Sequence, residues 1–275
     1  MNPLQLVAGL LVFGAIFALL EGLRPAVPAQ PRRRRGWKTD IGWWFVTPLV
    51  TKPLTRVALV LGLVGAAALA GVPLERDALE GFLAPRPPVA DWPFWLQLTS
   101  FLLLADLLGY LAHRLLHARI LWPVHAVHHS SREVDWLSAV RAHPLNDLFS
   151  RSVQALPLVL FGFDPTLLAV WVPLLVFYAI FVHANVPWDF GPLRYVIATP
   201  AFHRWHHAEA TNEGCNFAGM FPLWDLLFGT FYLPVGEAPP AYGIRGDDMP
   251  ESLLGQVVYP FRRATAARLR ATDQN

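Results

Sequence analysis

The sequence has almost no cysteine and few charged residues. Its one cysteine, Cys215, excludes an intramolecular disulfide and a cysteine-rich metal site. Charged residues make up 15% of the chain and hydrophobic residues 54%, whereas an average soluble domain has about 25% charged residues. The formal net charge of +2 is too small and too dispersed for nucleic-acid binding. This composition predicts a membrane protein, and the length of 275 residues suits one compact domain.

Apolar stretches predict the membrane-embedded part of the chain. Residues 41–72 are interrupted by Pro48 and Pro53, and residues 153–182 by the segment 162–165. We expect the segment 162–165 to be a turn between two short helices. Residues 153–182 would then form a hairpin that enters and leaves the membrane on the same side. The predicted fold class is therefore all-α: an integral membrane helical bundle with a histidine-rich metal-binding cap. It has three full spans plus the hairpin, the spans being residues 4–20, 41–72 and 92–111.

The distribution of charge predicts which way the bundle is oriented. The basic residues 32–35 and Lys38 follow the first span instead of preceding it, which favours an uncleaved helix over a signal peptide. A solvated linker or a nucleic-acid patch would be alternative interpretations of this run. Beside a membrane helix, the positive-inside rule assigns it to the cytoplasm. The N-terminus and residues 73–91 would then lie outside, and the histidines and the C-terminus, with a basic helix expected at 261–270, on the cytoplasmic face.

All ten histidines lie between His113 and His207, and most fall into three clusters. Four-residue spacing on a helix places two imidazoles on one face, where they can reach one metal or two adjacent metals. An isolated pair is more often structural, but three clusters in a membrane protein favour metal binding, since unpartnered imidazoles are costly at membrane depth. The clusters are HxxxH (His113, His117) and two HxxHH motifs (His125, His128, His129; His203, His206, His207).

The number and type of these residues limit the choice of metal. Eight imidazoles are too many for one octahedral ion, so two ions are expected. Imidazole suits iron, zinc, copper and nickel, but structural zinc closes with four ligands and favours cysteine. A two-metal site with open positions is suited to the activation of dioxygen or water.

Between residues 95 and 232 the sequence resembles the fatty acid hydroxylase / sterol desaturase superfamily. The resemblance implies two iron ions that use dioxygen and two electrons to hydroxylate or desaturate a lipid C–H bond. The resemblance implies that the metal-bound oxidant itself performs the oxidation, and it indicates no separate catalytic acid or base. The electrons would come from a b-type cytochrome, a ferredoxin or a reductase, because no haem, flavin or ferredoxin motif is found. The matching residues are Asp106, Tyr110, His113–Arg114, 128–131, 141–145, 199–200, 203–207, Asn216, 223–225 and 228–230.

The sequence departs from the family pattern at four places, none of which removes a histidine. The family often has Asn where Asp135 stands and Glu where Asn146 stands. It often has Tyr-Gly at Phe217-Ala218, and commonly Arg at Leu226. These departures leave the subfamily and its substrate open.

Further polar residues are candidates for the site. The resemblance suggests that His183 is another ligand, the alternative being an interfacial histidine with a backbone partner. His143 is expected to be auxiliary. Asp106, two helical turns before His113, could accept an imidazole N–H or pair with an arginine. Asn216 and Asp225 are expected either to support the ligands or to form turns.

Two other functions are alternatives to the oxygenase. A membrane hydrolase that acts on a lipid ester or phosphate would use a two-metal centre to activate water. Such centres usually contain bridging carboxylates, and the histidine clusters contain none. A metal transporter would place its histidines within the spans instead of at one face. The predicted organisation is N-terminal membrane helices and basic loop (1–94), catalytic domain (95–235) and C-terminal tail (236–275).

Overall fold

The computed structural model describes residues 2–211, 214–246 and 249–272, with side chains up to residue 263. Every named element within these ranges is helical, which confirms the predicted all-α class. The one β-type contact there is an isolated bridge between Ala208 and Tyr242.

Four helical segments are long and apolar enough to cross a membrane, as predicted for a multi-pass protein. Most of their side chains are not buried within the protein, which is the pattern expected of surfaces that face lipid tails. The segments are α1 (Pro3–Leu23), the continuous run Trp37–Leu69, α5 (Phe94–Leu116) and α8 (Pro165–His183).

The interruption expected at Pro48 and Pro53 does not occur. The run consists of α2 (Trp37–Val46), the π-helix η1 (Thr47–Thr51) and α3 (Lys52–Leu69), without a break. A proline lacks the N–H needed for the regular α-helical hydrogen bond, and a π-helical turn accommodates such a defect. The two prolines therefore change the helix type locally and leave the span intact.

The predicted hairpin is present, but its helices are longer than expected. It consists of α7 (Pro144–Leu160, 17 residues) and α8 (19 residues), so α8 alone can cross a membrane. Gly162 in the turn has φ of +94°, and an added Cβ would lie 3.0 Å from the Arg86 carbonyl oxygen. That close contact explains why the turn needs a glycine. Because α7 begins after His143 and α8 ends at His183, both outer ends return to the histidine-bearing end.

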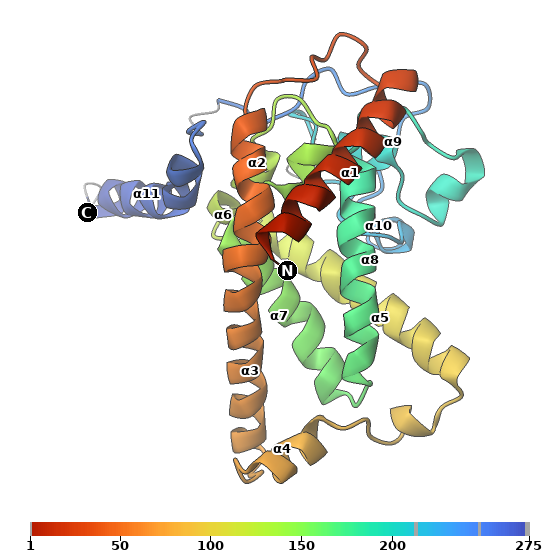
Figure 1. Ribbon diagram of the computed structural model, residues 1–275, viewed down its shortest axis with the longest axis vertical. Helices are drawn as coiled ribbons and strands as arrows, with labels where there is room; N and C mark the ends of the chain where they lie inside the picture. Colours follow the sequence, from red (N-terminus) through yellow and green to blue (C-terminus); the bar gives the residue numbers. More distant parts are fainter. Residues whose placement is uncertain (1, 212–213, 247–248, 273–275) are drawn as a thin grey trace.

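The histidine-bearing segments gather at one end of the bundle (Figure 1). The hairpin turn and α4 (Arg76–Leu83) lie at the opposite end, whereas the loop between α1 and α2 lies at the end that holds α9 (Pro200–His206). Helix α11 (Leu253–Thr272) extends away from the bundle. The remaining elements are η2 (Val89–Asp91), α6 (Trp122–His129), η3 (Trp136–Val140), η4 (Gly191–Tyr195) and α10 (Leu223–Leu227).

Aromatic packing joins the N-terminal helix to the histidine-bearing region. Phe17 of α1 is buried and stacks on Trp136 of η3, with ring centroids 5.7 Å apart. Trp44 of α2 contacts the same Trp136 ring edge-on at 6.1 Å. Such aromatic pairs contribute about 0.5–1.5 kcal/mol each beyond their area burial. Helices α1 and α2 thus pack directly against the segment that follows the second histidine cluster.

Candidate metal centre

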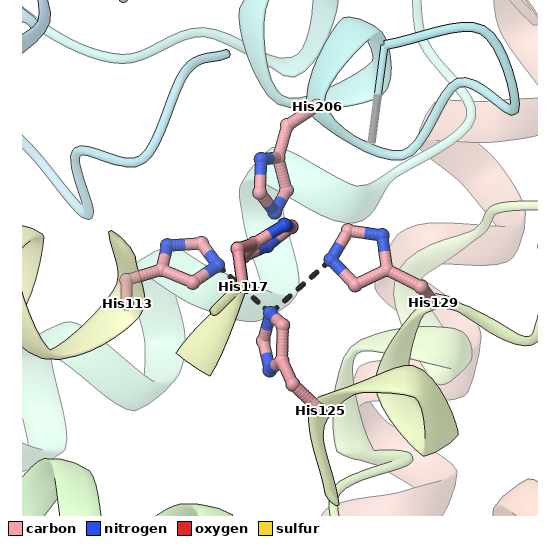
Figure 2. A group of neighbouring side chains, drawn as sticks. All are labelled: His113, His117, His125, His129 and His206. Atoms are coloured by element: carbon pink, nitrogen blue, oxygen red, sulfur yellow. Dashed lines mark hydrogen bonds between the residues drawn. The ribbon is translucent and has the colours of Figure 1, made fainter. Parts of the chain in front are cut away.

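Nine of the ten histidines form two groups. In each group, one nitrogen from every imidazole lies within 4.8 Å of those of the other members. Figure 2 shows the first group, in which imidazoles from α5, α6 and α9 converge. The first group is His113, His117, His125, His129 and His206; the second is His128, His183, His203 and His207.

Five of these imidazoles have a defined tautomer. A carbonyl or amide oxygen can only accept a hydrogen bond, so the ring nitrogen that contacts it must carry the proton. In each of the five, that nitrogen is Nδ1, which leaves Nε2 with a free lone pair. The contacts are His113 to Phe217 O (2.8 Å), His125 to Asn146 Oδ1 (2.7 Å), His128 to Arg141 O (3.0 Å), His183 to Ala179 O (2.6 Å) and His206 to Cys215 O (2.8 Å).

The free lone pairs face one another inside both groups. Nε2 of His113 lies 3.0 Å from Nε2 of His125, and Nε2 of His128 lies 3.2 Å from Nε2 of His183. Neither contact can be a hydrogen bond when both Nδ1 atoms hold the protons. Nε2 of His206 is buried without a hydrogen-bond partner. A cation between these nitrogens would satisfy them all, so the residues fit a metal ion in each group.

The two groups lie directly beside each other. The rings of His129 and His207, one from each group, have centroids 4.5 Å apart, and those of His128 and His129 are 5.6 Å apart. The adjacent histidines of each HxxHH motif belong to different groups: His128 and His129 in the first motif, and His206 and His207 in the second. Cations bound in the two groups would therefore lie side by side.

Six of the grouped histidines lie outside the membrane spans and have lowered pKa values, and burial favours their neutral form. It lowers the pKa of His128 to about 4. For the others burial is again the largest cause, and the charge of neighbouring imidazoles lowers the pKa values further. Neutral imidazole is the form that binds metals, so the site is ready for metal at neutral pH. The histidines with pKa values well below the ordinary 6.5 are His125, His129, His203, His206 and His207.

Residues 215–221, here called the strap, orient two of the imidazoles. The Cys215 carbonyl accepts from His206 and the Phe217 carbonyl from His113. Asn216 has φ of +58°, and its side chain donates to the carbonyls of Phe202 and Tyr232 and accepts the Tyr232 N–H. The amide therefore ties the strap to α9.

Two buried carboxylates hold the rest of the strap. Asp225 accepts the N–H groups of Phe217 and Ala218, both at 2.8 Å. Asp106 accepts those of Met220 and Phe221, both at 2.9 Å. This differs from both expectations for Asp106, an imidazole N–H or an arginine, because α5 passes beside the strap backbone. The auxiliary roles predicted for Asp106, Asn216 and Asp225 stay predictions, and the strap is the path through which they would act.

A buried charge network lies behind His128, and no sequence motif indicated it. Asp40 is bound at 2.6 Å by both Arg34 and Arg141, and Arg34 also binds Asp135 at 2.6 Å. The carbonyl of Arg141 accepts the His128 Nδ1 proton. An added Cβ at Gly36 would lie 2.6 Å from Nη2 of Arg141, and Gly36 has φ of +79°. The network therefore depends on a glycine beside it.

Two expectations about this region change as a result. Arg34, from the run interpreted as a basic cytoplasmic loop, is only 1% exposed and belongs to the network. Asp135, where the family often has Asn, supplies the second carboxylate that a buried arginine pair requires. Arg34 and Asp135 are 101 positions apart in sequence, as are Asp40 and Arg141, so no local pattern could have indicated these two pairings.

His143 lies outside both groups, and Asn146 is a site residue that the sequence did not identify. Nδ1 of His143 accepts the Leu145 N–H at the start of α7, and Nε2 donates to the Val257 carbonyl of α11. In the first turn of the same helix, Asn146 accepts the His125 proton. An auxiliary role for His143 remains a prediction, and its contacts suggest that it would act by fixing α7.

His183 has the features of both alternatives considered for it. Its Nδ1 has a backbone partner, the Ala179 carbonyl, whereas its Nε2 lies 3.1 Å from Nε2 of His203. The first contact fixes the tautomer that leaves the second nitrogen free. Its role as a ligand stays a prediction. Of the other departures, Phe217 packs against His113 and His117, with centroids 5.8 and 5.0 Å apart, and Leu226 is exposed.

Comparison with known proteins finds relatives that are named hydroxylase, monooxygenase and oxidase. Ornithine lipid hydroxylase OlsE of Rhizobium tropici is 31% identical over 252 residues, covering 90% of this chain and 73% of that protein. Alkylglycerol monooxygenase of Homo sapiens is 35% identical over 126 residues, 44% of this chain and 27% of that protein. C-4 methylsterol oxidase erg25 of Schizosaccharomyces pombe is 33% identical over 154 residues, 53% of this chain and 50% of that protein.

The chain thus spans only about a quarter of the human monooxygenase and half of the yeast oxidase. No solved structure matches it significantly. The fatty acid hydroxylase family model matches residues 98–230, which contain all nine grouped histidines. Since the relative from Rhizobium tropici also matches over most of both chains, the protein belongs to the fatty acid hydroxylase family, a family of oxygen-dependent membrane oxidoreductases.

Proposed function

We propose that the protein is a di-iron lipid hydroxylase, with one ion bound by each histidine group. His113, His117, His125, His129 and His206 would hold the first ion, and His128, His183, His203 and His207 the second. The observation that carries this proposal is the pair of contacts in which two unprotonated Nε2 atoms face each other, one contact in each group. A cation bound between the two nitrogens would explain each contact.

The ligands suit iron among other metals, and the proposed reaction favours it. Imidazole suits several metals, but zinc has no redox chemistry. The relatives are named hydroxylase, monooxygenase and oxidase, and these activities need a redox metal. When bound, the two ions would activate dioxygen, so that one oxygen atom enters a C–H bond and the other leaves as water, at the expense of two electrons and two protons.

The residues of the chain itself fix and shield this centre. Backbone carbonyls and Asn146 hold the Nδ1 protons, so each Nε2 points to the metal position in one orientation. His129, His206 and His207 are buried, whereas His113, His117 and His128 are partly exposed. We infer that the substrate approaches from the side of the partly exposed histidines.

The proposed substrate is a polar membrane lipid, and the proposed reaction is hydroxylation. The relative that matches most of the chain is named for an ornithine lipid, and others for alkylglycerols and methylsterols. A lipid with a polar head and an oxidisable chain is what the first two substrates share. Among the described residues, both metal groups consist of histidines alone. They contain none of the bridging carboxylates typical of a two-metal hydrolase, so they do not support that alternative.

We further propose that the metal centre faces the cytoplasm. The loop with the basic residues 32–35 lies at the histidine-bearing end, and the positive-inside rule assigns such loops to the cytoplasm. Electrons would come from a separate protein, either a b-type cytochrome, a ferredoxin or a reductase. A cytoplasmic centre would be accessible to all three.

The test is oxygen labelling with the full-length protein purified in detergent and loaded with iron. It is given a reductant and a lipid extract under ¹⁸O₂. We expect about two iron ions per chain and ¹⁸O in a new lipid hydroxyl group. Label that arrives from H₂¹⁸O would support a hydrolase, and full activity with zinc would exclude redox chemistry. His206→Ala is the inactive control, and Arg76→Gln, on the exposed helix α4 far from the centre, is the active one.

A further inference from the structure

Where η1 and α3 pack against α7, one acidic and two further cationic side chains lie within electrostatic reach of Lys52. Lys52 interacts electrostatically with Arg56 on its own helix and with Asp147 and Arg151 on α7. The two helices pack tightly, since an added Cβ at Gly62 would lie 3.1 Å from a methyl group of Leu156. Three positive charges minus one negative charge leave this α3–α7 cation cluster with a net charge of +2.

The cluster lies on a surface that is otherwise apolar. On both sides of it α3 and the preceding turn expose leucine and valine side chains, and Arg56 is exposed among them. Lys52 and Arg151 are half-buried. The exposed apolar neighbours are Leu49, Val50, Leu54, Val57, Val60 and Leu61.

The length of the span places the cluster near the edge of the hydrocarbon layer. The run Trp37–Leu69 has 33 residues, more than the roughly 20 that a bilayer core requires. Roughly 20 residues counted back from Leu69 end close to Val50. Lys52 would then lie just inside that boundary and Arg56 one turn deeper, from where both can extend toward the headgroups. Asp147 directly follows Asn146, so the cluster is also close to His125.

An excess of positive charge at this depth needs an anion. Charged groups near hydrocarbon are costly unless they are paired, and Asp147 can neutralise only one of the three cations. Basic residues beside the membrane attract anionic lipids, and the planar guanidinium of Arg matches phosphate. A soluble acidic protein would be a poor partner, because the exposed leucine and valine side chains would lie in its interface with the cluster.

We propose that the α3–α7 cation cluster binds the phosphate headgroup of an anionic phospholipid beside the metal centre. The bound lipid would neutralise the cluster and fill the surface between α3 and α7. This binding site goes beyond the proposed oxidation, since it would exist whichever lipid is hydroxylated and in the absence of turnover.

The experiment is lipid retention measured by native mass spectrometry on the full-length protein in a neutral detergent. Phosphatidylglycerol or phosphatidylcholine is added at increasing molar ratio. We expect preferential retention of phosphatidylglycerol, reduced at least five-fold in Lys52→Gln/Arg151→Gln. The matched control, Arg76→Gln/Arg245→Gln, also removes two positive charges, both at exposed positions, and should retain as much lipid as the unmodified protein.

A charge-increasing variant keeps the test decisive if the double variant folds poorly. Asp147→Asn raises the net charge of the cluster from +2 to +3 and should increase retention of phosphatidylglycerol. Equal retention of the two lipids, or unchanged retention in both cluster variants, would overturn the proposal. Displacement of the lipid by millimolar inorganic phosphate would also overturn it, since the site would then bind free phosphate. The lipid measurement does not depend on iron or turnover, so the lipid-binding proposal and the proposed function can fail separately.

Discussion

Replacing Asp40 by Asn should destabilise the protein by leaving a buried arginine without a carboxylate. Asp40 binds Arg34 and Arg141, and its side chain is fully buried. In Asp40→Asn, Arg34 keeps Asp135 as partner, whereas Arg141 loses its only carboxylate within the network. Removing one partner of a buried pair costs about 3–5 kcal/mol because the other charge stays buried and uncompensated. We expect a loss of that size in the free energy of unfolding.

A double-mutant cycle tests whether the charge balance is the cause. The network holds two arginines and two aspartates, so either Asp40→Asn or Arg141→Met leaves a net charge of one. The double variant leaves only the neutral Arg34–Asp135 pair. It should therefore be several kcal/mol more stable than the sum of the single effects predicts.

The assay is chemical denaturation in mixed micelles, together with iron content in folded protein. Arg141 also holds the His128 proton through its carbonyl, so single variants that shift this backbone should lose iron from the second histidine group. A matched control is Arg76→Gln, which breaks an exposed pair with Glu80 and should change stability by less than about 1 kcal/mol. Additive effects of Asp40→Asn and Arg141→Met would refute the idea that charge balance stabilises the network.

Three further predictions concern the ligands, the topology and the pH dependence. His206→Ala should lose iron and turnover together, whereas His143→Ala should keep nearly two ions per chain and turn over slowly. Elemental analysis of variants matched for thermal stability checks this prediction. A His206→Ala variant that keeps both iron ions would contradict the ligand assignment. A reporter fused after Asn275 should report the cytoplasm, and one inserted in residues 73–91 the opposite side; finding both on one side would exclude the proposed orientation. Burial lowers the pKa of His143, so the unfolded chain takes up this proton first. The contribution of neutral, buried His143 to the free energy of unfolding should be complete above about pH 6.5. It should decrease as the pH falls below this value. His143→Asn, which keeps a capping side chain, should therefore lose less stability than the unmodified protein in acid denaturation curves below pH 6.5, and identical curves would contradict this.

The sequence by itself determined the class of fold and identified most of the histidines that form the two groups. Apolar stretches longer than a membrane core can be recognised from composition alone, because in lipid only a helix satisfies every backbone group within its own segment. The HxxxH and HxxHH motifs were equally informative, since helical spacing alone puts their imidazoles on neighbouring positions. His183 followed only from the family resemblance, because a single histidine at a helix end carries no pattern.

Tertiary structure decided how these residues are divided and held. The split of each HxxHH motif between two groups depends on how α5, α6, α8 and α9 cross, which local spacing does not specify. The roles of Asp106 and Asn146, and the pairing of Arg34 with Asp135 across 101 positions, depend on contacts between distant segments. Even the two prolines that suggested a broken span are absorbed by a π-helical turn. Local sequence fixes the period and polarity of each helix, but a buried hydrogen bond or ion pair is chosen only when the helices pack and every buried polar group must find a partner.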